Sequence, residues 1–265
     1  MSAPDPWADL RRHTAARIAL GRAGGSLPTD ALLDFQLAHA RARDAVQHAV
    51  DFAGVAAEIT RATDLNTLKL DSAAADRQSY LRRPDLGRRL STASKAHLVE
   101  QTQDLTESRI DLALVVGDGL SGFAAERNVP PLLEALAPLL RDRGWRLAPV
   151  VLVEHARVAI QDEIGELLNA RLSVILIGER PGLGTADSLA AYFTWAPRIG
   201  RSDAERNCIS NIRAEGLPPA DAARRLDRLL GAAFERQLSG VSLKDDSPLE
   251  QLGGSVDTRN QGLLE

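Results

Sequence analysis

Residues 110–122, which read IDLALVVGDGLSG, decide the fold. The segment Ile110–Val116 is a nearly continuous apolar run, and it stops at the glycine-containing turn Gly117–Gly122. A strand that is buried on both faces carries apolar residues without polar alternation, so this run is typical of a central strand in a parallel sheet. The turn that follows is typical of the connection from such a strand to a helix.

Two later apolar runs, Leu147–Val153 and Leu172–Ile177, have the same character. Helical periodicity lies between the three runs, over about 121–143, with a break expected at Val129–Pro131, and over about 158–170. We therefore expect an α/β fold with a Rossmann-like open parallel sheet and helices on both faces. The segments 192–195 and 220–238 are expected to add a short strand and a closing helix.

The chain divides into three regions that differ in sequence pattern. Residues 1–106 have a helical pattern, with one helix expected from an N-cap at Thr29 to near Gly54 and another over about 91–103. We expect this helical N-terminal region to contact a partner subunit. Residues 107–244 form the Rossmann-like domain, and residues 245–265, which are polar and without periodicity, are expected to form a loose tail.

Composition excludes several classes of protein. The chain has 265 residues, a net charge of −4, 44% hydrophobic and 26% charged residues, values that are ordinary for a globular protein. Nucleic acid is not expected as a partner, because there is no excess of positive charge and only ten aromatic residues offer stacking surfaces. No apolar segment is long enough for a membrane span and no secretory signal is visible, so a cytoplasmic protein with no membrane association is expected.

Ligands of open α/β sheets bind at the carboxyl ends of the strands, which directs attention to three loops. The first, Gly117–Gly122, matches the G-x-G-x-x-G pattern of dinucleotide sites. The acidic residue expected about 20 positions later is missing, since the next strand ends at Glu154, and Asp118 puts a carboxylate where a pyrophosphate would lie. An NAD(P)-binding oxidoreductase that uses this turn remains an alternative, and a ligand-free scaffold protein is a third possibility.

The loop Gly178–Gly184 follows the third strand and contains three glycines, which let a ligand approach the backbone closely. Glu179 in this loop can accept hydrogen bonds from amide groups. No acid–base pair, nucleophile–base pair or metal-binding spacing is visible in the sequence, so no catalytic residue is expected in this chain. This pattern favours a subunit that binds a ligand over one that performs the reaction. A block of five arginines within residues 77–89 suits a partner surface that is rich in carboxylates.

Six stretches, in order along the chain, resemble the small (light) subunit of ethanolamine ammonia-lyase. They are GRAGGSLPT at 21–29, LDFQLAHARARDAV at 33–46, YLRRPDLG at 80–87, DGLS at 118–121, IGERPGL at 177–183 and RNCISNI at 206–212. The resemblance implies a subunit of an enzyme that converts ethanolamine to acetaldehyde and ammonia with adenosylcobalamin. It also implies a large subunit, a TIM barrel that carries the substrate site, in a hetero-oligomer with this chain.

The resemblance further implies that the small subunit closes over the cobalamin at the subunit interface. The family's cobalamin contacts fall on Val158, Glu179 and Cys208 of this sequence, and the cobalt is held by the cofactor. Cobalamin proteins that replace the cofactor's base with a histidine use a D-x-H-x-x-G loop, which this sequence lacks. We therefore expect base-on adenosylcobalamin. Some members of the family work inside a bacterial microcompartment, which is the expected location if the organism makes one for ethanolamine use.

Overall fold

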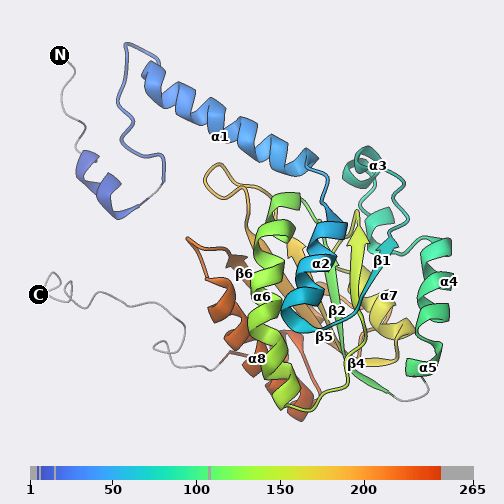
Figure 1. The fold of residues 1–265 in the computed structure, drawn as a ribbon. Helices are drawn as coiled ribbons and strands as arrows, with labels where there is room; N and C mark the ends of the chain where they lie inside the picture. The colour runs from blue at the N-terminus through green and yellow to red at the C-terminus, as the bar shows by residue number, and fades with distance from the viewer. Residues whose placement is uncertain (1–4, 6, 15, 107–108, 246–265) are drawn as a thin grey trace, which may run out of the picture.

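The computed structural model describes residues 5, 7–14, 16–106 and 109–245. The tail expected over 245–265 lies outside the described residues, apart from its first residue. Figure 1 shows a central sheet covered by helices, with one long helix extending away from it.

Within the described residues, six strands form one sheet, in the order β1-β3-β2-β4-β5-β6. Strands β1 to β4 are parallel, whereas β5 runs antiparallel to β4 and β6 antiparallel to β5. The strand bounds are Thr67–Asp71, Ile110–Gly117, Val150–Glu154, Ala170–Gly178, Leu189–Trp195 and Arg206–Ile212. The expected α/β class is confirmed, and the sheet is mostly parallel rather than wholly so.

Two strands were not predicted from the sequence. The region expected to be helical up to residue 106 contains β1, five residues long, which pairs with β3 at one edge of the sheet. The other edge is β6, whose residues Asn207, Ser210 and Asn211 break the apolar pattern. A polar strand at a sheet edge has one row of backbone groups unpaired and needs no apolar run, so neither edge strand resembles the central strands.

The principal helices of the described residues are α1 Thr29–Gln47, α2 Phe52–Thr63, α3 Arg77–Arg82, α4 Thr92–Gln101, α5 Gln103–Thr106, α6 Gly122–Asp142, α7 Ile160–Leu167 and α8 Pro219–Arg236. Helices α2, α6 and α8 cover one face of the sheet, and α4 and α7 cover the other (Figure 1). Along β2, Leu112 and Leu114 join the first core while Ala113 and Val115 join the second. This two-sided burial explains why the strand is apolar at consecutive positions.

Three of the expected helix limits are wrong. Thr29, the expected N-cap, is the first residue of α1, and the N-cap position is taken by Pro28 without a side-chain cap. The helix predicted to end near Gly54 ends at Gln47, because Asp51 starts α2 by accepting a hydrogen bond from the Gly54 N–H at 3.0 Å. The break predicted at Val129–Pro131 does not occur, since α6 runs through both prolines. Each internal proline costs about 3 kcal/mol in a helix, and the extensive buried face of α6 against the sheet and α8 offsets this cost.

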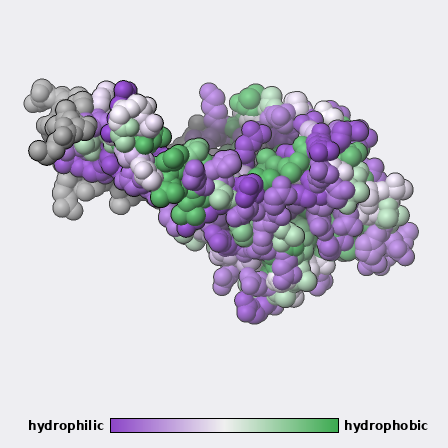
Figure 2. Space-filling view, turned by 90° about the horizontal axis from the view of Figure 1, so that it is seen from above, coloured by the Kyte–Doolittle hydropathy of each residue, from purple (hydrophilic) through white to green (hydrophobic). Residues whose placement is uncertain are grey.

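Helix α1 extends away from the sheet as an arm (Figure 1), and only Ala38 and Ala45 of the helix are buried. Large hydrophobic side chains on it and on the preceding segment are exposed, namely Trp7, Leu10, Leu27, Leu32, Leu33, Phe35 and Leu37. Figure 2 shows hydrophobic residues gathered on this arm. A patch of this kind on a globular protein marks an interaction surface.

The chain reverses its direction of winding between β2 and β4, because β3 lies on one side of β2 and β4 on the other. Gly119 lies in the turn after β2 with φ of +58°, and an added Cβ would come within 2.2 Å of the Gly178 carbonyl oxygen after β4. The Leu120 N–H donates a hydrogen bond of 3.0 Å to that same oxygen. The turns after these two strands are thus packed backbone against backbone.

This contact predicts a large loss of stability on substitution of Gly119 by alanine. Gly144 has a similar φ of +66°, but an added Cβ there would meet no atom of the described residues within 4 Å, so the two glycines form a matched pair. We expect Gly144→Ala to lower the free energy of unfolding by about 1 kcal/mol, and Gly119→Ala by about 3 kcal/mol because steric overlap adds to the backbone strain. Urea denaturation measures both, and equal losses would contradict the packing argument.

Candidate functional site

A buried ion pair organises the carboxyl end of the sheet. Arg77 Nη1 lies 2.9 Å from Asp118 Oδ2 and donates a further hydrogen bond to the Gly119 carbonyl oxygen, while Arg77 Nε donates to the Val46 carbonyl oxygen at 2.6 Å. The other carboxylate oxygen of Asp118 accepts from the Ala156 N–H at 2.9 Å. One ion pair therefore connects the end of α1, the turn after β2 and the loop after β3.

Asp118 is almost completely buried, and burial raises its pKa, an effect that the Arg77 guanidinium and the Ala156 N–H oppose. The turn predicted as a possible dinucleotide site is consequently filled by its own chain. The Leu120 N–H is bound to Gly178, and the Ala124 N–H is bound to the Ser121 hydroxyl. Because pyrophosphate binding at such a turn needs these backbone donors, the geometry argues against the NAD(P) alternative.

Two pockets lie beside this closed turn, on the face of the sheet that carries α7. The larger has a volume of about 520 Å³ and is lined by Pro84, Arg88, Arg157, Val158, Ala159, Tyr192, Arg201, Ser202, Asp203, Arg206 and Cys208. The smaller, of about 190 Å³, is lined by Tyr80, Gly119, Leu120, Arg157, Val158, Ile177, Gly178, Glu179, Arg180 and Tyr192. The pockets adjoin, because Arg157, Val158 and Tyr192 line both.

The three residues carried over from the family resemblance all border these pockets. Val158 lines both, Glu179 lines the smaller pocket and Cys208 lines the larger one. They come from three separate segments: the loop after β3, the end of β4, and β6 at the edge of the sheet. Of the described residues, none forms a hydrogen bond with the Val158 N–H.

The Glu179 side chain is held by its own chain through one oxygen only. Its Oε2 accepts a short hydrogen bond from the Ser188 hydroxyl and another, of 3.0 Å, from the Asn211 N–H. The Oε1 atom has no hydrogen-bond partner in the part of the chain that the structure describes. The carboxylate is therefore fixed in place with one acceptor oxygen left for a ligand.

Tyr192 of β5 and Cys208 of β6 are neighbours across the two strands. Partial burial of the thiol raises the pKa of Cys208, a hydrogen bond with Tyr192 lowers it, and the nearby Glu179 carboxylate raises it further. The net upward shift keeps the thiol protonated at neutral pH, which makes it a weak nucleophile. Cys208 is therefore suited to contact a ligand and poorly suited to attack one.

Sequence reasoning missed Tyr192 and Arg157, which line both pockets. Tyr192 faces Cys208 only because β6 joins the sheet, and the residues of β6 carry no strand pattern. Arg157 lies next to Val158, and its guanidinium stacks 4.2 Å above the Tyr80 ring. Tyr80 in turn donates a hydrogen bond to the Ala156 carbonyl oxygen at 3.0 Å, so α3 and the loop after β3 are joined beneath the pockets.

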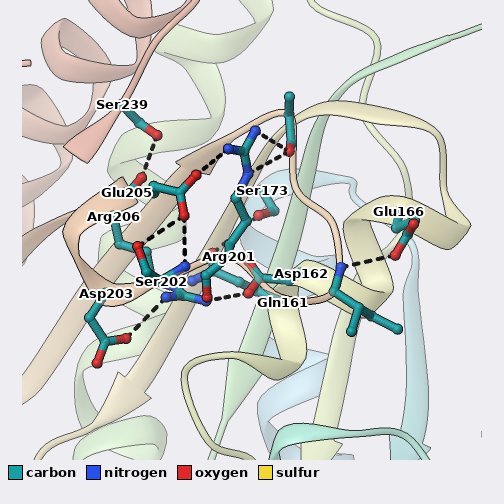
Figure 3. A network of polar contacts seen from close by, with 12 residues as sticks. Gln161, Asp162, Glu166, Ser173, Arg201, Ser202, Asp203, Glu205, Arg206 and Ser239 are labelled. Atoms are coloured by element: carbon teal, nitrogen blue, oxygen red, sulfur yellow. Dashed lines mark hydrogen bonds and ion pairs between the residues drawn. The ribbon is translucent and has the colours of Figure 1, made fainter. Parts of the chain in front are cut away.

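Figure 3 shows the polar network below the larger pocket. Arg206, whose side chain is 2% exposed, binds the buried Asp162 of α7, the exposed Asp203 and the Arg201 carbonyl oxygen. Arg201 binds Glu205 and the carbonyl oxygens of Trp195 and Ala196. The network fixes β6 against α7, and thus determines where Cys208 lies.

Within the described residues, no group of three or more His, Cys, Asp or Glu side chains could hold a metal ion. In the same residues, no helix is long and apolar enough to cross a bilayer.

Comparisons with known proteins place this site in context. Residues 4–244 match the family model described as ethanolamine ammonia-lyase light chain. The chain is 56% identical over 263 residues to the ethanolamine ammonia-lyase small subunit of Pseudomonas paraeruginosa, covering 99% of this chain and 96% of that one. It is 54% identical over 256 residues to the protein of that name from Pseudomonas syringae pv. tomato, covering 97% of this chain and 88% of that one.

A third relative, from Pseudomonas fluorescens, is 55% identical over 258 residues, which are 97% of this chain and 93% of that one. All three bear the name of a lyase subunit, so the chain belongs to this class of protein. More specifically, the chain belongs to the ethanolamine ammonia-lyase small-subunit (light-chain) family. The resemblance identified from the sequence is thereby confirmed.

The network in Figure 3 predicts a pH dependence of stability. Burial raises the pKa of Asp162 to about 6, and Arg206 only partly opposes this shift. Because the folded state holds this proton more tightly than the unfolded chain, the stability contributed by Asp162 is present below pH 4 and is lost as the pH rises through 6. Relative to Asp162→Asn, the wild-type chain should lose about 2–3 kcal/mol of unfolding free energy between pH 4 and pH 7.

Urea denaturation of the two chains at a series of pH values measures this difference. The exposed Glu100→Gln variant controls for the removal of one negative charge. A difference between wild type and Asp162→Asn that stays constant over this pH range would show that Asp162 is not perturbed by burial.

Proposed function

We propose that this chain is the small subunit of an adenosylcobalamin-dependent ethanolamine ammonia-lyase, and that it closes over the cofactor at the interface with the large catalytic subunit. The observation that carries the proposal is the position of Val158, Glu179 and Cys208. Three segments remote in sequence bring these residues to two adjoining pockets at one edge of the sheet. Their clustering is what a common ligand requires.

The proposed reaction converts ethanolamine to acetaldehyde and ammonia. Adenosylcobalamin, when bound, supplies the carbon radical that begins this conversion. The Cys208 thiol is held protonated, and the Glu179 carboxylate is occupied on one oxygen by Ser188 and Asn211. The substrate site and the catalytic groups are therefore assigned to the large subunit, and this chain is assigned the binding and enclosure of the cofactor.

The pocket residues fit the chemistry of a corrinoid. Carboxamide arms surround the corrin ring, and each arm has both N–H donors and a carbonyl acceptor. Glu179 Oε1 is an acceptor without a hydrogen-bond partner in the described chain. The Val158 N–H is a donor that likewise has no partner there. Because a buried amide is costly unless both its groups are bonded, a donor and an acceptor in one site match an amide arm well.

The form of the pockets supports a shared site. Arg88 and Cys208 on the rim of the larger pocket are exposed, so the cavity is open to the outside of the chain. An open half-site leaves one side of a large ligand in water unless a partner covers it. We assign this role to the large subunit, with the exposed face of α1 and the exposed Arg82, Arg83 and Arg89 as further contacts of the N-terminal region.

Two further assignments follow from the family. We propose that the cofactor binds with its own base on the cobalt, since the sequence lacks a D-x-H-x-x-G loop. We propose a cytoplasmic location, or a bacterial microcompartment in an organism that makes one for ethanolamine use.

The proposed function predicts that ammonia release needs both chains. We expect the purified large subunit alone to show little activity with ethanolamine and adenosylcobalamin. Addition of this chain should restore activity and saturate at a fixed ratio of subunits, because the cofactor is enclosed only in the complex. The measurement is ethanolamine-dependent ammonia release during the titration. Full, saturable activity of the large chain alone would overturn the proposal.

Glu179 provides a test of the site itself. In the complex with the large subunit, Glu179→Ala should weaken cobalamin binding by about 1–3 kcal/mol, because a buried amide donor of the ligand loses its acceptor. Glu179→Gln keeps an oxygen at this position and should lose less. Spectroscopic titration with cyanocobalamin gives the dissociation constants, and Glu215→Gln, an exposed carboxylate outside both pockets, is the control. An unchanged constant in Glu179→Ala would exclude the contact.

A further inference from the structure

The larger pocket is lined by four arginines, Arg88, Arg157, Arg201 and Arg206, and by a single carboxylate, that of Asp203. Asp203 is turned outward, with its side chain fully exposed, and is paired with Arg206. Guanidinium groups only donate hydrogen bonds and carry a permanent positive charge. The lining is therefore rich in hydrogen-bond donors. Because Arg201 and Arg206 are paired with Glu205, Asp162 and Asp203, the positive charge left for a ligand comes from Arg88 and Arg157.

The four arginines fall into two pairs. Arg201 and Arg206 are engaged in the network of Figure 3 and form the base of the pocket. Even so, Arg206 Nε is buried and has no hydrogen-bond partner in the described chain. Arg88 is exposed, and within the described residues its side chain forms no hydrogen bond or ion pair. Of these side chains, Arg88 is therefore the one available to an anion that enters the pocket.

Arg157 is held in position without an anionic partner among the residues that the structure describes. Its guanidinium stacks on the Tyr80 ring, and its Nη2 donates to the Tyr80 carbonyl oxygen at 3.3 Å. Its backbone N–H donates to the Gly87 carbonyl oxygen at 2.7 Å, and its side chain packs so closely on Gly87 that an added Cβ would lie 2.9 Å from Arg157 Cγ. Arg157 Nε is buried and unbonded in the described chain. A pre-positioned arginine loses little conformational entropy when it binds an anion.

We propose that the larger pocket is an anion subsite, with Arg157 and Arg88 as its ligand-facing groups, and that it takes the phosphodiester of the cofactor's nucleotide loop. The proposal rests on the proposed function, which puts a cobalamin across the two pockets. Among the groups of a cobalamin, the carboxamide arms are neutral and both donate and accept, whereas the phosphodiester is anionic and only accepts. A pocket of donors matches the phosphodiester and not an amide arm.

A carboxylate of the large subunit is the rival occupant, since it too is an anion that accepts hydrogen bonds. The two are separated by ligands that differ only in the phosphate. Cobinamide and cobinamide phosphate both lack the nucleotide base, so the ratio of their dissociation constants isolates the contribution of the phosphate group. A contact with the large subunit would not change this ratio.

The experiment measures corrinoid binding to the complex of both subunits by absorbance titration. The probes are dicyanocobinamide, cobinamide phosphate and cyanocobalamin. We expect the wild-type complex to bind cobinamide phosphate more tightly than cobinamide. Arg157→Gln should reduce this preference about tenfold, and Arg88→Gln, whose side chain is exposed, about threefold. Binding of unphosphorylated cobinamide should stay within about twofold of wild type in both variants.

Two control variants separate loss of the anion contact from other effects of the substitutions. Arg89→Gln removes an exposed arginine next to Arg88 that does not line the pocket, and should leave the preference unchanged. Arg157→Lys keeps the positive charge and should retain part of the preference for cobinamide phosphate. Thermal melting of each complex shows whether Arg157→Gln perturbs the loop. Equal losses for all three corrinoids, or weaker assembly with an unchanged preference, would overturn the anion subsite. Failure of all three corrinoids to bind the wild-type complex would instead overturn the proposed function.

Discussion

The buried ion pair of Arg77 and Asp118 is the constraint on which the rest of the site depends. Its hydrogen bonds join three segments: the last turn of α1, the turn after β2 and the loop after β3. Removal of either partner would leave the other charge buried and unpaired, which is far more costly than the loss of an exposed ion pair. The pair therefore fixes the relative positions of the segments that carry the pocket residues.

The same arrangement explains why the pockets lie beside the switch in strand order rather than in it. The crevice between β2 and β4, where open α/β sheets usually bind their ligands, is closed by contact between Gly119 and Gly178. The free space is displaced toward α7 and the antiparallel strands β5 and β6. Tyr192 and Cys208 gain access to the site in this way, and the two adjoining pockets extend from the turn after β2 to β6. Adjoining pockets suit a large ligand of the kind proposed above.

The buried part of the fold could be predicted from the sequence, and the edges could not. Ile110–Val116 was recognised because burial on both faces requires apolar residues at consecutive positions. Strand β6 is not predictable from the sequence, because its exposed edge permits the polar residues Asn207 and Ser210. The contact between Cys208 and Tyr192 depends on this strand and could not be predicted either. Of the site residues, Val158 and Glu179 follow central strands and lie where strand ends predict a ligand. Cys208 was identified only from a family motif, since its position depends on pairing between strands that carry no local signal.

The arm formed by α1 has a consequence for how the cell must handle this chain. Leucine and phenylalanine side chains along it are exposed to water in the single chain, and such surfaces favour self-association and recognition by chaperones and proteases. Copies synthesised in excess would be lost to aggregation or degradation before they could assemble. In the assembly with a large subunit proposed above, we therefore expect the two polypeptides to be produced in matched amounts and at the same time.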